Sequence, residues 1–207
     1  MKSRLTLEKM WWPIVLLSGV AAYVLAMIFS IGQSIWFDEG YSILLAKSSW
    51  GDLFALTAVD AHPPLYYALL KVWGSIFGFG EFALRSLSAV LLSGAIIAGL
   101  VLLRRMFGAK VALYALPFII FAPFLIRYGY EVRMYSLALL IGVSATYALI
   151  TAKASKGWRM WVVYAVLVAL GMYTLYMTLV IWLAHFVWLL VGTLKDKKRA
   201  PLKTWKW

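Results

Sequence analysis

The sequence predicts an all-α membrane protein with about six transmembrane helices and further short helices in a long first outer loop. Of its 207 residues, 64% are hydrophobic and only 14% are charged. A typical soluble domain has about 45–50% apolar and about 25% charged residues, so this composition excludes a water-soluble globule. The sequence also has no cysteine, which excludes disulfide bonds, thiolate nucleophiles and cysteine-bound metals.

Long uncharged stretches define the expected transmembrane helices. The last of them, Met160 to Leu194, has 35 residues and as one straight helix would measure about 52 Å at about 1.5 Å per residue. Because a hydrocarbon core is about 30 Å thick, we expect this stretch to fold back near Gly171–Met177 and to form two helices. The other predicted helices are Pro13–Ile31, Leu87–Leu103, Val111–Ile126 and Met134–Ala152.

The distribution of charge predicts how the chain is oriented. If the N-terminus is inside, 15 of the 20 basic residues and two of the eight acidic residues lie inside, which gives +13 there and −1 outside. An excess of Lys and Arg marks the cytoplasmic side of a membrane protein. The net charge of +12 is therefore explained by orientation, and we expect no nucleic-acid partner.

We expect one membrane module over residues 1–194, with an outer loop at 32–86, and a basic cytoplasmic tail at 195–207 that lies at the anionic membrane surface. The first helix is expected to be an uncleaved signal anchor. Its uncharged run of 19 residues, Pro13–Ile31, exceeds the 7–15 residues of a cleavable signal.

The outer loop is long, apolar and rich in acidic residues. Pro63-Pro64 predicts a helix start that continues over Leu65–Phe77 with an apolar face. Ser49 to Asp52 has the spacing of a helix-capping box. We therefore expect short interfacial helices along the outer leaflet, with ionisable side chains that need a partner or a task there.

Three pairs of ionisable residues near the outer surface are candidates for chemistry, and each also has a structural interpretation. Asp38 and Glu39 either cap the helix that follows or point apart, one of them into a cavity. Asp60 and His62 either cap the next helix or bind a metal ion or phosphate.

The third pair stands at the start of the fourth predicted transmembrane helix. Glu131 and Arg133 either form a structural ion pair or present an arginine that binds phosphate, with Glu131 as an acid-base group or metal ligand. His185 has no partner at a suitable spacing, and we interpret it as a packing residue.

Four short motifs in order resemble the N-terminal half of the glycosyltransferase C superfamily, in its protein-mannosyltransferase and aminoarabinose-transferase branch. The resemblance extends over about Trp11 to Leu194. Each motif is weak alone, and their order and spacing make the match specific. The motifs are Trp36-Phe37-Asp38-Glu39-Gly40-Tyr41-Ser42, Asp60-Ala61-His62-Pro63-Pro64-Leu65-Tyr66-Tyr67, Leu84-Arg85-Ser86-Leu87-Ser88 and Glu131-Val132-Arg133-Met134-Tyr135.

The resemblance implies a multi-spanning enzyme that takes a sugar from a polyprenyl-phosphate carrier on the outer face of the plasma (cytoplasmic) membrane. The charge distribution and six spans place both termini in the cytoplasm. The acceptor would be a hydroxyl of a protein, lipid or glycan. Asp38 matches the catalytic base of the family, and Arg133 best matches the arginine that binds the lipid phosphate. Some members hold a divalent metal ion, for which we assign no ligands. The substrate-binding residues expected here are Glu39, Asp60, His62, Glu131, Arg133 and Tyr135.

Members of the superfamily are typically much longer, so we expect a fragment, a minimal enzyme or one half of an assembly. Two other functions stay open at this point. One is a non-catalytic membrane module that binds lipid carriers or a partner subunit. The other is a small transporter, which would need ionisable residues at the bilayer midplane. The predicted transmembrane helices offer essentially none beyond His185.

Overall fold

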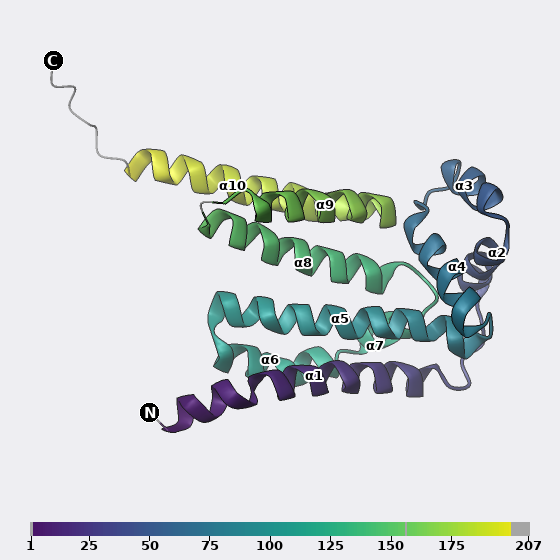
Figure 1. Ribbon diagram of the computed structural model, residues 1–207, viewed down its shortest axis with the longest axis horizontal. Coiled ribbons are helices and arrows are strands. Elements are labelled where there is room, and N and C mark those ends of the chain that lie inside the picture. The colour runs from purple at the N-terminus through teal and green to yellow at the C-terminus, as the bar shows by residue number, and fades with distance from the viewer. Residues whose placement is uncertain (1, 156, 200–207) are drawn as a thin grey trace, which may run out of the picture.

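The computed structural model describes residues 2–155 and 157–199, with side chains described for 9–155 and 157–194. The described residues form helices and no strand, as the sequence predicts. Long helices lie side by side in a bundle, and three short helices gather at one end of it (Figure 1). The protein is an integral membrane protein of the all-α class.

Four helical segments of the described chain are long and apolar enough to cross a membrane. They are Lys9–Ser30 within α1 (Lys2–Ser30), α5 (Glu81–Phe107), α8 (Tyr135–Ala154), and Tyr176–Leu194, which includes most of α10 (Leu179–Arg199). A bent pair of helices raises the number to five, and the remaining expected crossing is α9 (Arg159–Thr174). Its 16 residues span only about 24 Å, which is less than a typical hydrocarbon core of about 30 Å.

The third predicted helix, Val111–Ile126, is broken into two in the structure. The structure has α6 (Ala109–Ile120) and α7 (Pro123–Tyr130), which meet at 64°. The physical reason is Pro123, which has no backbone N–H to continue the ladder of α6 and instead begins α7. The residues that follow α7, Glu131 to Met134, are not helical.

The fold-back within the long apolar stretch is confirmed. A short 3-10 turn, Tyr176–Thr178, separates α9 from α10, and the two helices run in opposite directions (Figure 1). Gly171 allows a close approach there, because a Cβ atom at that position would lie 2.5 Å from the Trp182 ring. His185 of α10 is buried, as a packing residue would be.

His185 also has polar contacts that the sequence did not predict. Its ring nitrogens lie 3.1 Å from the Thr146 hydroxyl and 3.2 Å from the Tyr164 hydroxyl. Thr146 donates its own proton to the Gly142 carbonyl, so its oxygen accepts from Nε2 of His185. These bonds join α10 to α8 and α9.

The outer loop forms the predicted short helices, α2 (Phe37–Lys47), α3 (Trp50–Ala58) and α4 (Leu65–Phe77). Ser49 caps α3 by accepting a hydrogen bond from the Asp52 backbone N–H at 3.1 Å. The apolar face of α4 is buried through Tyr66, Tyr67 and Leu70, which pack with residues of α2, α5 and α8 in one core. A second core lies between α1, α5, α6 and α7.

The start of α1 and the end of α10 lie at the end of the bundle opposite α2, α3 and α4 (Figure 1). This arrangement agrees with an even number of crossings between them. The predicted basic tail begins in the last turns of α10, and its residues 200–207 lie outside the described part of the chain.

The two ends of the bundle should be accessible from opposite sides of a membrane. Because the chain has no cysteine, a single introduced cysteine gives a unique label. Val59 and Trp158 are 87% and 71% exposed and lie at opposite ends. We expect a membrane-impermeant maleimide to label only one of Val59→Cys and Trp158→Cys in intact cells, and both after permeabilisation. Labelling of both in intact cells would contradict this topology.

Candidate active site

A buried ion pair between Glu39 and Arg85 connects the outer loop to the helix bundle. The Nη2 atom of Arg85 lies 3.0 Å from Oε2 of Glu39, and its Nε lies 3.3 Å from Oε1. Each residue is only 1% exposed. Two parallel N–H···O bonds of this kind are the strong, fork-shaped form of an ion pair.

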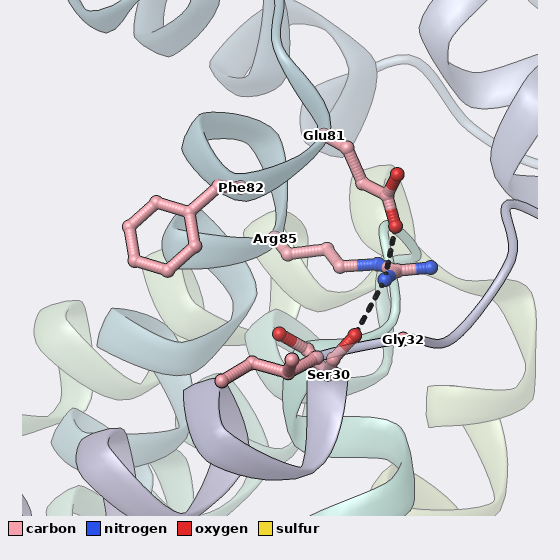
Figure 2. Close-up of a pocket in the computed structure, with 6 residues that line it drawn as sticks. Ser30, Gly32, Glu81, Phe82 and Arg85 are labelled. Carbon is pink, nitrogen blue, oxygen red and sulfur yellow. Dashed lines mark hydrogen bonds and ion pairs between the residues drawn. The ribbon is translucent and has the colours of Figure 1, made fainter.

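Arg85 also binds the end of α1. Its Nη1 donates to the carbonyl oxygens of Ser30 at 3.0 Å and Gln33 at 2.9 Å, and its Nη2 donates to that of Ser34 at 3.2 Å. Glu81, one turn earlier on α5, forms a second ion pair with the guanidinium at the edge of a 240 Å³ cavity (Figure 2). The last carbonyls of a helix have no partner within it, so a cation there satisfies them.

Glu39 holds a further segment through the same carboxylate. Its Oε1 accepts the backbone N–H of Val132 at 3.0 Å, and its Oε2 accepts that of Trp36 at 3.4 Å. Glu39 therefore fixes the non-helical stretch between α7 and α8 that contains Glu131 and Arg133. Glu39 is among the predicted substrate-binding residues, and that role stays a prediction. In the structure its carboxylate is buried and in a position to orient these neighbours.

Arg133, in the same non-helical segment, is the centre of a second cluster of polar residues. It is 3% exposed, and it contacts the Tyr67 hydroxyl at 3.4 Å, Nε2 of His62 at 3.3 Å and Oδ2 of Asp38 at 3.8 Å. Its Nε is buried and has no hydrogen-bond partner. Burial opposes its charge, yet its pKa is raised, with Tyr67 as the largest favourable cause.

Asp38 and His62 approach this arginine directly, and Asp60 approaches His62. Asp38 is 37% exposed, so its carboxylate is open to solvent as well as near Arg133. Oδ1 of Asp60 lies 3.8 Å from Nδ1 of His62. Because a guanidinium only donates, Nε2 of His62 accepts from Arg133, and the ring proton lies on Nδ1, facing Asp60.

Glu131 and Tyr135 complete the set of predicted site residues. Glu131 is 1% exposed, its Oε1 has no hydrogen-bond partner, and burial raises the pKa of its carboxyl group. Tyr135 is half-buried at the start of α8 and packs edge-on against the Tyr128 ring at 4.8 Å. It also lies close to Arg133 and helps to raise the pKa of that group.

Unpartnered polar atoms concentrate in this cluster. Four buried side-chain N or O atoms of the described residues have no hydrogen-bond partner. Three of them belong to predicted site residues: Oδ2 of Asp60, Oε1 of Glu131 and Nε of Arg133. Such atoms are rare in folded proteins because each one costs desolvation free energy, so their grouping favours a site that is completed by a ligand.

Two tyrosines and one arginine of this region were not among the predicted site residues. Burial raises the pKa of Tyr67 to about 12, and burial followed by the nearby Asp60 raises that of Tyr41. The two rings pack edge to face at 6.3 Å beside Arg133. All three missed residues, Tyr41, Tyr67 and Arg85, lie within the motifs quoted above.

The described residues do not fit a preformed metal site. No group of three or more His, Asp or Glu side chains among them has the geometry to hold a metal ion. Arg133 also lies where the free lone pair of His62 would face a cation. A divalent metal therefore stays an expectation of the resemblance, and no step proposed below uses it.

The bundle of apolar helices is that of a polytopic membrane protein. At one end of it, the fold brings an arginine and several acids together in one polar cluster. The family model described as dolichyl-phosphate-mannose-protein mannosyltransferase matches residues 61–205. The chain belongs to this family, whose description names a sugar donor linked to a polyprenyl phosphate. The match includes His62, Glu131, Arg133 and Tyr135 and begins just after Asp60. Neither curated proteins nor solved structures give a match.

Removing Arg85 should destabilise the protein strongly. Arg85→Met leaves the Glu39 carboxylate buried without its partner, and breaking a buried ion pair costs about 3–5 kcal/mol. We expect a much lower midpoint of thermal unfolding in detergent. Arg127→Met, at an exposed arginine of the same end, is the matched control and should change the midpoint little. An unchanged midpoint for Arg85→Met would show that the pair does not hold the fold.

Proposed function

We propose that this chain transfers a sugar from a polyprenyl-phosphate carrier to a hydroxyl acceptor on the outer face of the plasma membrane, with inversion at the anomeric carbon. The family supplies the lipid-phosphate donor, and mannose is the sugar that its description names. The observation that carries the proposal is the position of Arg133 within 3.8 Å of Asp38 and 3.3 Å of His62. These residues come from three segments of the chain that the fold brings together.

Asp38 is proposed as the general base. It is the acidic residue that both approaches Arg133 and remains open to solvent, so an acceptor hydroxyl can reach it. A phosphate is a good leaving group, and the reaction therefore needs a base for the acceptor more than an acid for the donor. Asp60 faces His62, whereas Glu131 is buried and its raised pKa makes it less readily ionised.

Arg133 is proposed to bind the phosphate of the donor. Its unpartnered Nε and a neighbouring Nη atom form the edge of a guanidinium that can hold two phosphate oxygens. Tyr67 and His62 support this group and fix its plane. Because the side chain is buried, its charge acts through less solvent and stabilises negative charge more strongly.

In the proposed reaction, the acceptor oxygen gives its proton to Asp38 and attacks the anomeric carbon. A new carbon–oxygen bond forms on the face opposite the phosphate. The bond from the anomeric carbon to the phosphate oxygen breaks, and its electron pair leaves with the polyprenyl phosphate. Arg133 stabilises the charge that grows on that oxygen. This single displacement explains the proposed inversion.

The non-catalytic alternative, a module that binds the lipid carrier, shares the role of Arg133 but requires no base. To distinguish the two proposals, the purified chain is placed in liposomes that contain a radiolabelled lipid-linked sugar, and transfer of the label is measured. Transfer of label to an acceptor supports the enzyme. Binding of the carrier without any transfer supports the binding module.

Replacing Asp38 should slow transfer strongly without loss of the fold. Asp38→Asn keeps the shape of the side chain but removes the base, and a general base contributes about 10²–10⁴-fold in rate. We expect the rate of sugar transfer to fall by that factor while donor binding is retained. Asp52→Asn, at a carboxylate of the same loop that contacts Ser49, should transfer at the normal rate. Normal transfer by Asp38→Asn would refute the assignment of the base.

Replacing Arg133 should weaken donor binding. Arg133→Lys keeps one positive charge but loses the planar fork that binds two phosphate oxygens. Since a hydrogen bond to a charged group contributes about 1.5–3 kcal/mol, we expect Kd for polyprenyl phosphate to rise by at least about tenfold. Arg159→Lys, at the other end of the bundle, is the control. An unchanged Kd would exclude Arg133 as the phosphate ligand.

A further inference from the structure

A second cavity with basic walls lies at the end of the bundle opposite the candidate active site. It has a volume of about 370 Å³ and lies where α1, α5 and α8 meet. Two adjacent arginines and three aromatic residues provide most of its lining. The lining residues are Trp11, Trp12, Val101, Arg104, Arg105 and Tyr147.

The two arginines are held against separate aromatic rings. The guanidinium of Arg104 lies 4.7 Å from the ring centre of Trp11, which is 1% exposed, and that of Arg105 lies 5.5 Å from the ring centre of Tyr147. Neighbouring residues on a helix differ by about 100° in direction, so the two groups reach α1 and α8 respectively. A ring contact orients a guanidinium through its face and leaves its positive charge in place.

The charge around this cavity favours an anion. Of the eight acidic residues in the sequence, six lie at the other end of the bundle or in the loop there: Asp38, Glu39, Asp52, Asp60, Glu81 and Glu131. The two others, Glu8 on α1 and Asp196 on α10, lie toward the cavity end, where basic residues outnumber them. The cavity end instead has further basic residues at the ends of α1, α6, α8 and α9: Lys9, Lys110, Lys153 and Arg159 (Figure 1). None of the six lining residues is acidic.

The position of the cavity favours a lipid over a soluble anion. It lies at the end of two transmembrane segments, where Trp and Tyr mark the boundary of the hydrocarbon core. From Trp12, the surface of α1 continues toward the bilayer centre with Leu16, Leu17 and Val20, each more than half exposed. Such a wall is suited to acyl chains, and basic pockets between transmembrane helices are typical sites for anionic head groups.

We propose that this cavity binds the head group of an anionic phospholipid of the leaflet at that end of the bundle, with its phosphate between Arg104 and Arg105. The acyl chains would lie along the exposed apolar side of α1. The lipid would join α1, α5 and α8 at the end opposite the candidate active site. This proposal does not depend on the proposed sugar transfer.

Lipid selectivity of the purified full chain tests the proposal. The protein is placed in mixed micelles with equal amounts of phosphatidylglycerol and phosphatidylcholine that have the same acyl chains, and the retained lipids are counted by native mass spectrometry. We expect the wild-type chain to retain phosphatidylglycerol preferentially. Arg105→Gln should lower that preference roughly fivefold, the effect of one basic residue near an anionic surface.

Two further variants separate a defined site from general surface charge. Arg159→Gln removes the same charge at the same end but outside the cavity, and it should leave the preference unchanged. Tyr147→Leu keeps every charge and removes the ring that orients Arg105, so it should lower the preference. A Tyr147→Leu chain that unfolds at the normal midpoint yet keeps full preference would overturn the proposed geometry.

Three other results would overturn the proposal. The first is no preference for phosphatidylglycerol in the wild-type chain, and the second is an equal loss in Arg159→Gln and Arg105→Gln. The third is displacement of the bound lipid by millimolar inorganic phosphate, which would show a site for soluble anions. If Arg105→Gln fails to fold, Arg105→Lys serves in its place. Arg105→Lys keeps the positive charge but loses the planar fork of the guanidinium.

Discussion

The buried ion pair between Glu39 and Arg85 is the interaction on which the outer end of the molecule depends. Arg85 satisfies the carbonyl groups at the end of α1, while Glu39 accepts hydrogen bonds from the backbone N–H groups of Trp36 and Val132. One pair thus joins α1, α2, α5 and the segment before α8. Two charges removed from water stabilise a structure only when they are fully hydrogen-bonded, and here nearly all of their capacity is used.

The candidate site is built on this framework and differs from it in one respect. The Glu39 carboxylate is saturated, whereas Arg133, Glu131 and Asp60 each keep a buried polar atom without a partner. One short segment takes part in both the ion pair and the candidate site. The Val132 N–H donates to Glu39, and the side chain of Arg133, the next residue, reaches His62 and Asp38. A rigid support next to an incompletely paired cluster is the arrangement expected of a preorganised binding site.

Much of the fold follows from local features of the sequence, and the exceptions have physical causes. Uncharged runs, Ser49 and Pro63-Pro64 predicted the helices because hydrophobicity and capping act over a few residues. The bend at Pro123 was missed because the uncharged run continues through the proline. The site was found only in part. Asp38 and Arg133 lie 3.8 Å apart, and their proposed roles stay predictions. The pairing of Glu39 with Arg85 joins residues 46 positions apart and has no local signal.

The separation of acidic and basic residues between the two ends of the bundle has a consequence for insertion. Six of the eight acids lie at one end of the bundle and most of the cations lie at the other, so the chain has a large electric dipole along the bundle axis. A membrane potential acts on the two ends with opposite sign, at about 2.3 kcal/mol for each charge moved across 100 mV. An energised membrane therefore favours one of the two orientations of this bundle over the other.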